Sequence, residues 1–114
     1  MATLPESDHI AHLQLMRLLE EHPEYTQRQL SEALGVSLGK AHYLLKALLA
    51  RGLVKAQNFQ RSEHKWGYLY VLTPAGARRK VQLTRLFLNQ KEHEYEQLRR
   101  EIESLRSELA DDAG

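Results

Sequence analysis

The chain of 114 residues contains no cysteine, only three prolines and no long apolar run. The lack of cysteine excludes disulfide bonds and thiolate metal sites. No apolar stretch approaches the roughly 18 residues that a membrane-spanning helix needs. The N-terminus lacks the basic and apolar segments of a secretory signal peptide. We therefore expect a protein of the cytoplasm, with no membrane partner, that consists of one small domain and at most one appendage.

Catalytic and nucleotide-binding motifs are also missing. The chain has no H-E-x-x-H or G-x-S-x-G pattern, and its six histidines are scattered. The stretch Gly35–Ala41 is similar to a phosphate-binding loop, but it has one residue too few between its glycines and an alanine after Lys40. His9 and His12 have no third metal ligand near them in the sequence, so we expect solvated histidines. We predict no enzyme, no cofactor and no metal site.

Charge is distributed unevenly, although the net charge is only +1. Residues 26–91 contain 12 Lys or Arg and two acidic residues, Glu32 and Glu63, which gives this segment a net charge of +10. Residues 1–25 carry −4 and residues 92–114 carry −5. A basic centre is either an ordinary solvated surface or a surface that binds a polyanion. We favour the second interpretation because the basic centre coincides with the motif that follows.

The segment Thr26–Gly52 has the pattern of two short helices joined by a sharp turn. Thr26 and Gln29 have the spacing of a capping box. Gly35 is placed to end the first helix with a positive φ, and Ser37 is placed to cap the second. Apolar residues at helical spacing predict the inward faces, which are Leu30, Ala33 and Leu34 in the first helix and Ala41, Leu44, Leu45 and Leu48 in the second. Such a pair is a helix-turn-helix, whose second helix can enter a groove of DNA.

The residues around this segment complete a winged helix. A helix from Ser7 or Asp8 to about His22 precedes it, with Ile10, Leu13, Met16, Leu18 and Leu19 as its apolar positions. Two strand-like runs, residues 53–59 and 66–72, follow it, and the polar residues 60–65 between them predict a long hairpin loop that projects. Thr73 and Pro74 then mark the start of a further helix.

We therefore predict a mainly α fold with a small β-hairpin, in which a winged helix-turn-helix domain over residues 1–73 is followed by a long C-terminal coiled-coil helix over residues 74–110. Residues 111–114 are predicted to be a disordered tail. The long helix contains no proline after Pro74. At 1.5 Å per residue it is roughly 50 Å long, which is too long to pack on so small a domain.

The long helix carries a heptad repeat. One set of positions, which we call a, recurs every seven residues and contains Val81, Leu88, Tyr95, Ile102 and Leu109. A second set, which we call d, lies between them at alternating spacings of three and four residues and contains Thr84, Lys91, Leu98 and Leu105. Isoleucine at a and leucine at d favour two parallel helices. We predict a homodimer through a parallel coiled coil whose seam contains Leu88, Tyr95, Leu98, Ile102, Leu105 and Leu109.

The charged residues beside this seam favour the parallel orientation. Glu94 and Glu101 lie at g, and Arg99 and Arg106 lie at e, so a parallel pair brings opposite charges together and an antiparallel pair brings like charges together. The alternative is a single amphipathic helix that folds back on the domain and forms its ion pairs internally, as Glu96 and Arg100 would.

The predicted recognition helix leaves a set of side chains outside its apolar stripe, which are Leu38, Gly39, Lys40, His42, Tyr43 and Lys46. Lys40 can donate to guanine or phosphate, Leu38 can contact a thymine methyl group, and Gly39 permits close approach of the backbone. Ser37 and Thr26 lie at helix N-termini, which favour phosphate, and Arg28 is near. In the wing, Arg61, His64 and Lys65 are candidates for the minor groove or the backbone.

Four motifs resemble those of bacterial winged-helix regulators of the MarR type. They are GVSLGK at residues 35–40, LKAL at 45–48, GLVKAQNF at 52–59 and YLYVLTPAG at 68–76. The match covers about residues 16–77 and is similar in particular to the MarR-like regulators associated with exopolysaccharide gene clusters. The resemblance implies DNA binding as a dimer in the cytoplasm, at the bacterial nucleoid. MarR proteins are longer and form their dimer from helices at both ends, so the resemblance assigns no small-molecule effector here.

The sequence thus predicts a homodimeric transcriptional regulator that binds double-stranded DNA at a palindromic or pseudo-palindromic operator, with exopolysaccharide genes as the targets that the resemblance suggests. The alternative is a winged-helix module that binds another protein and uses its coiled coil as a scaffold.

Overall fold

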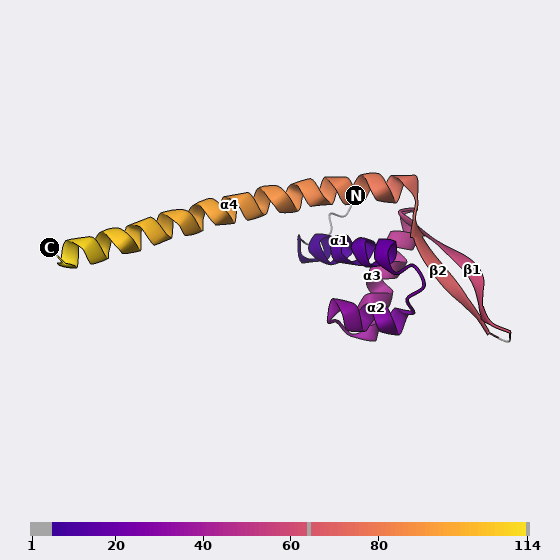
Figure 1. The fold of residues 1–114 in the computed structure, drawn as a ribbon. Helices are drawn as coiled ribbons and strands as arrows, with labels where there is room; N and C mark the ends of the chain where they lie inside the picture. Colours follow the sequence, from indigo (N-terminus) through magenta and orange to yellow (C-terminus); the bar gives the residue numbers. More distant parts are fainter. Residues whose placement is uncertain (1–5, 64, 114) are drawn as a thin grey trace. The chain divides into compact units, whose positions relative to one another are not determined.

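The computed structural model describes residues 6–63 and 65–113, and its elements follow the predicted order (Figure 1). Helices α1 (Glu6–Glu21), α2 (Gln27–Leu34) and α3 (Leu38–Ala50) precede the strands β1 (Val54–Ser62) and β2 (Lys65–Leu72), and helix α4 (Pro74–Ala113) follows. The chain divides into two units, Met1–Leu83 and Thr84–Gly114, which are described separately. The predicted fold class, a mainly helical winged helix-turn-helix with a long C-terminal helix, is confirmed.

The turn between α2 and α3 forms from the predicted capping residues. Thr26 Oγ1 accepts a hydrogen bond from Gln29 N at 3.1 Å, and Thr26 N donates to Gln29 Oε1 at 2.8 Å, which completes the capping box. Gly35 ends α2 with a φ of 70°, a conformation that favours glycine. Ser37 Oγ accepts from Lys40 N at 3.0 Å and starts α3. Local hydrogen bonds therefore fix where α2 and α3 begin and where α2 ends.

The core of the first unit consists mainly of leucine side chains from the three short helices, and Val54, Tyr70 and Leu83 complete it. In α3 the predicted stripe is confirmed, since each of its four side chains is at most 1% exposed. In α2 only Leu30 is fully buried, whereas Ala33 is exposed. Helix α1 contributes Leu13, Leu15, Met16 and Leu19. Burial of one leucine side chain stabilises the fold by about 2 kcal/mol, so the stripe determines which face of α3 points inward.

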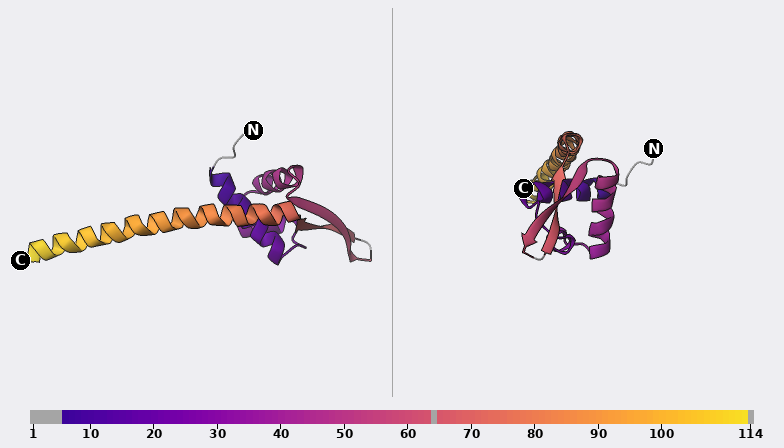
Figure 2. Two further views of the ribbon diagram at one scale, coloured as in Figure 1. Left: turned by 90° about the horizontal axis from the view of Figure 1, so that it is seen from above. Right: turned by 90° about the vertical axis from the view of Figure 1, so that its right-hand side faces the viewer.

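The wing is a longer and tighter hairpin than the sequence predicted. Strands β1 and β2 pair antiparallel from Val54 opposite Leu72 to Ser62 opposite Lys65, with a register shift between Gln60 and Ser62. The predicted six-residue loop was wrong, because only residues 63 and 64 separate the strands. Backbone pairing therefore continues past the end of the apolar pattern, as far as Ser62 opposite Lys65. The far ends of β1 and β2 reach beyond α1, α2 and α3 (Figure 2).

Backbone contacts attach the base of the wing to the helices. Tyr70 N donates to the carbonyl of Pro23 at 3.1 Å, which ties β2 to the loop after α1. Thr73 Oγ1 donates to Gly52 O at 2.6 Å and accepts from Gly76 N at 3.0 Å, so the predicted cap of α4 is also a tether to the end of α3. Gly76 packs so closely that a Cβ there would lie 1.9 Å from the carbonyl oxygen of Leu53.

Helix α4 begins at Pro74 and continues to Ala113, past the predicted end at residue 110, so residues 111–113 of the predicted tail are helical. Nothing between Pro74 and Ala113 breaks the helix, because the segment has no internal proline and its one glycine, Gly76, lies in the first turn. Residues 74–83 belong to the first unit, where Leu83 is buried. The second unit is a single helical segment.

His12 on α1 is buried, which corrects the expectation of a solvated histidine. It is only 2% exposed, and its Nε2 atom has no hydrogen-bond partner among the described residues. Burial, followed by the positive charge of Arg51, lowers the pKa of His12 from 6.5 to about 4. His12 lies one helical turn from both Asp8 and Met16, which are buried, so it belongs to the inward face of α1.

We predict that His12 makes the fold sensitive to acid. The folded chain binds a proton on His12 less readily than the unfolded chain, so the stability should fall as the pH decreases from about 6.5 to about 4. Urea unfolding at pH 7 and pH 5 should give a loss of about 2 kcal/mol that disappears in His12→Leu. The exposed His93→Gln is the control and should retain the loss. Equal pH dependence of His12→Leu and the wild type would contradict the assignment.

Candidate nucleic-acid interface

The outer face of α3 presents most of the residues that the sequence assigned to it. Leu38 is 46% and Tyr43 50% exposed, although both are large and largely apolar. Gly39, His42 and Lys46 are exposed as well. These five residues lie opposite the buried leucine stripe of the same helix, and we call them the α3 face. The face offers an apolar contact, a phenol, an imidazole and a cation within three helical turns.

Lys40 is also partly exposed on α3, and its ammonium group is already paired. Lys40 Nζ lies 2.9 Å from Asp8 Oδ1 on α1 and 4.9 Å from the ring centre of Tyr43. The Asp8 side chain is 9% exposed and the Lys40 side chain 41%. The hydrogen bond from Lys40 lowers the pKa of Asp8 despite the opposing effect of burial, so the carboxylate is charged at neutral pH.

Helix α2 supports the α3 face through its first turn. Gln27 Oε1 lies 3.0 Å from His42 Nδ1, which fixes the imidazole ring against α2. Thr26 and Arg28, for which the sequence predicts phosphate contacts, are exposed beside it. The hydroxyl groups of Thr26 and Ser37 act as acceptors in the helix caps, but each still has a proton to donate.

The predicted wing contacts lie outside the described side chains. His64 is not described, and of Arg61 and Lys65 the structure gives only the strand positions. The described part of the wing instead exposes two aromatic rings, with Trp66 71% and Tyr68 52% exposed. These rings line a shallow depression of about 310 Å³ together with Tyr25, Thr26 and Gln27. The depression thus adjoins the start of α2.

Sequence reasoning missed three of these features. The Asp8–Lys40 pair spans 32 residues and the Gln27–His42 contact spans 15, so no local pattern indicates either. The aromatic residues Trp66 and Tyr68 are typical of a strand, but their residue types do not indicate that both rings are exposed. Alternation along β2 places Trp66, Tyr68 and Tyr70 on one face, but only Tyr70 is buried, because Trp66 and Tyr68 lie nearer the wing turn.

The predicted coiled-coil seam is exposed in the single chain. Ile102 is 41% exposed and the other seam residues exceed 50%, namely Leu88, Tyr95, Leu98, Leu105 and Leu109. One helix that exposes so many large apolar side chains in a heptad has an unpartnered apolar face.

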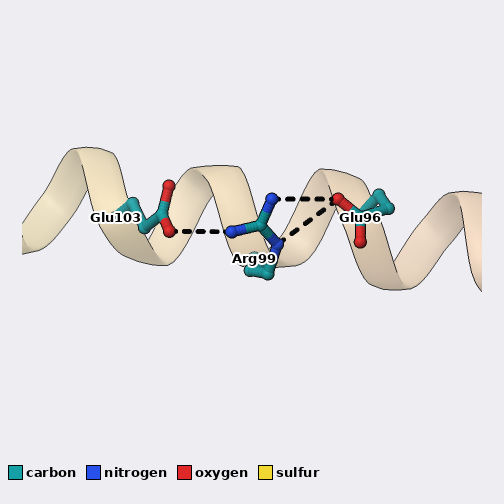
Figure 3. A network of polar contacts seen from close by, with 3 residues as sticks. All are labelled: Glu96, Arg99 and Glu103. Atoms are coloured by element: carbon teal, nitrogen blue, oxygen red, sulfur yellow. Dashed lines mark hydrogen bonds and ion pairs between the residues drawn. The ribbon is translucent and has the colours of Figure 1, made fainter.

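Ion pairs within α4 differ from the one that the sequence suggested. Arg99 donates to Glu96 at 3.2 Å and to Glu103 at 2.9 Å, so Arg99, and not Arg100, is the partner of Glu96 (Figure 3). Glu94 pairs with Lys91 at 3.2 Å. Glu101 and Arg106 have no ion pair within the described chain. Two of the four charges assigned to a partner helix therefore have partners in their own helix.

No helix in the described part of the chain is long and apolar enough to cross a membrane. No group of three or more metal-ligating side chains was found among the same residues.

The family model of the winged helix-turn-helix DNA-binding domain matches residues 9–55, from α1 to the start of β1. The chain thus contains a winged helix-turn-helix domain, consistent with the observed fold. A search of curated proteins gave no match.

Solved structures with this fold include several MarR regulators. A mutant of MarR from E. coli in complex with operator DNA is 25% identical with a TM-score of 0.58, and the match covers 75% of this chain and 59% of that one. MarR from Staphylococcus aureus in complex with salicylate and kanamycin is 19% identical with a TM-score of 0.54, and the match covers 75% of this chain and 55% of that one. The chain therefore spans little more than half the length of these two proteins.

A third structure matches nearly the whole chain. The transcriptional repressor CouR, bound to a 23-mer DNA duplex, is 22% identical with a TM-score of 0.61, and the match covers 95% of this chain and 83% of that one. These likenesses show that the chain has the fold of MarR regulators.

Proposed function

We propose that the protein is a transcriptional regulator that binds double-stranded DNA sequence-specifically as a homodimer. The observation that carries the proposal is the α3 face, which exposes Leu38, Tyr43 and their neighbours on the second helix of a winged helix-turn-helix. Large side chains exposed on that helix are suited to base edges in the major groove. The likeness to an E. coli MarR mutant that was solved with operator DNA supports the same role.

The α3 face supplies the specific contacts. Leu38 meets a thymine methyl group, and Tyr43 donates a hydrogen bond to a base edge or phosphate. His42 donates from Nδ1 to Gln27 Oε1, so its Nε2 atom accepts from the amino group of an adenine or cytosine. Lys46 is exposed further along the helix and contacts phosphate or guanine. Ser37, at the start of α3, contributes its hydroxyl and the helix N-terminus to a phosphate.

Phosphate contacts outside α3 supply most of the affinity. Thr26 and Arg28 at the start of α2 bind the DNA backbone. The wing residues Arg61, His64 and Lys65 bind the backbone as well or enter the minor groove. These residues belong to the basic centre of the sequence, residues 26–91, whose net charge of +10 attracts the DNA backbone. Association of this kind weakens steeply with salt.

Dimerisation through α4 presents two recognition helices to one operator. The heptad face of residues 88–109 pairs with the same face of a second chain in parallel, and Glu101 of one chain pairs with Arg106 of the other. A two-fold dimer binds two half-sites of a (pseudo)palindrome, about 34 Å or a multiple of it apart. Resemblance to exopolysaccharide-associated regulators suggests exopolysaccharide genes as targets and the bacterial cytoplasm, at the nucleoid, as the location.

The first prediction of this proposal concerns DNA affinity and salt. Duplexes selected from a random library by the wild-type protein should share a two-fold motif, and gel shifts over a salt series should give a steep slope. Arg28→Ala or Lys46→Ala should weaken binding to every duplex and reduce the slope by about 0.9 for each lost phosphate contact.

Arg100→Ala is the charge-matched control for this experiment, because Arg100 lies on α4 within the acidic segment. It should leave affinity and slope unchanged. A protein that selects no motif, or whose binding is indifferent to salt, would favour the alternative in which the winged helix binds another protein.

A second prediction separates stability from DNA binding at Gly39. A Cβ at this position would meet nothing closer than 4.0 Å, and alanine favours helix more than glycine does. Gly39→Ala should therefore raise the free energy of unfolding by about 0.5–1 kcal/mol. The same methyl group should weaken operator binding severalfold, because Gly39 faces the groove where the backbone comes close. Thermal unfolding and gel shifts test both effects, and unchanged operator affinity would refute the close approach.

A third prediction concerns the dimer. The wild type should have a solution mass of twice the 13.2 kDa of one chain. Ile102→Asp with Leu105→Asp places two charges in the seam and should give a monomer that has lost most of its operator affinity. Ser104→Asp with Ser107→Asp adds the same charges on the opposite side of the heptad and should remain dimeric. Sedimentation equilibrium distinguishes these states, and a monomeric wild type would exclude the dimer.

The orientation can be tested directly because the chain contains no cysteine. In a parallel pair, position 109 of one chain faces position 109 of the other. Leu109→Cys should therefore form an intermolecular disulfide under mild oxidation. In an antiparallel pair the two sulfurs are far apart, and the variant would remain reduced.

A further inference from the structure

We propose that Asp8 of α1 is a specificity-determining residue of the DNA interface, which acts by holding Lys40 in one orientation on the recognition helix. This inference rests on the proposed function, since it concerns how that interface distinguishes DNA sequences. Asp8 belongs to the acidic N-terminal segment and lies outside the helix-turn-helix, so neither the charge pattern nor the motif assigns it a role.

The geometry of the pair fixes the lysine and leaves it accessible. Lys40 Nζ donates to Asp8 Oδ1 at 2.9 Å from a side chain that is still 41% exposed, whereas the Asp8 side chain is 9% exposed. The carboxylate thus lies beneath the lysine and faces the protein. The ring of Tyr43, one turn further along α3, packs 4.9 Å from the same ammonium group. Two neighbours from two helices therefore restrict a side chain that is otherwise flexible.

An ammonium group has three donor hydrogens, and Asp8 accepts one of them. The others remain available for guanine O6 and N7, the acceptors that distinguish guanine in the major groove. The neighbouring carboxylate also compensates the lysine charge, so Lys40 adds little to the attraction of phosphates in general. Lys40 therefore donates selectively to guanine and contributes little to non-specific binding of phosphates.

The pair also explains why an acidic side chain is tolerated beside the α3 face. A carboxylate facing DNA would repel phosphate, but this one is covered by the cation that it binds. Among the described residues, His12 on the same helix and the Tyr43 hydroxyl also lower the pKa of Asp8. Asp8 therefore remains an anion that holds a donor in place.

The test compares Asp8→Asn with the wild type on a duplex selected from a random library and on a shuffled duplex of equal composition. The ratio of the two affinities should fall by roughly tenfold, because a fixed base contact is lost. Affinity for the shuffled duplex should rise, and its salt slope should steepen by about 0.9 per subunit, because Lys40 is free to bind phosphate. A merely structural role would weaken both complexes and leave the slope unchanged.

A double-mutant cycle shows whether Asp8 acts through Lys40. Lys40→Gln should give the same tenfold loss of selectivity, and Asp8→Asn added to it should leave the ratio unchanged. Circular dichroism identifies any preparation that does not fold, and Asp8→Ser then replaces Asp8→Asn.

The outcomes separate this inference from the proposed function. A selective wild type whose Asp8→Asn variant retains its ratio and slope would overturn the role of Asp8 alone. An Asp8→Asn effect that persists in full without Lys40 would overturn it as well. A wild type that selects no duplex would refute the proposed function, and the role of Asp8 with it.

Discussion

Burial of the leucine stripe of α3 is the constraint on which the rest of the domain depends. Ala41, Leu44, Leu45 and Leu48 are almost fully buried, and each leucine contributes about 2 kcal/mol. A rotation of α3 by half a turn would expose all of them. The same stripe therefore fixes which residues face outward, so core packing alone determines the composition of the α3 face. The capping residues set where the helix begins, but the stripe sets its rotation.

Features that depend on neighbouring residues were predictable from the sequence, and features that depend on distant ones were not. Two such local features are the capping box at Thr26 and Gln29 and the positive φ of Gly35. Each is indicated by the residue types at those positions and their spacing. The pairing of Asp8 with Lys40 and the burial of His12 arise where α1 packs against α3, and a sequence gives no register for that contact. The wing falls between these cases, since its existence was predictable but its length was set by backbone pairing beyond the apolar pattern.

The charged side chains of α4 can form ion pairs either within their own helix or with a partner helix. Arg99 binds Glu96 and Glu103 within its own helix, and Glu94 binds Lys91, so these side chains gain little by turning to a partner. Exposed pairs of this kind contribute only a few tenths of a kcal/mol in either arrangement. The apolar seam is therefore the main source of affinity in the proposed dimer, and charge selects its orientation chiefly through Glu101 and Arg106.

Affinity and specificity come from different parts of the proposed interface. Among the described side chains of the recognition helix, Lys46 is an exposed cation, whereas the charge of Lys40 is compensated by Asp8. Electrostatic attraction must therefore come largely from outside α3, from Arg28 and the rest of the basic centre. A recognition helix with little net charge binds poorly wherever its apolar and hydrogen-bonding groups do not fit the bases. The sequence concentrates positive charge around the helix, and the fold uses one buried carboxylate to keep that charge from dominating the contact with the bases.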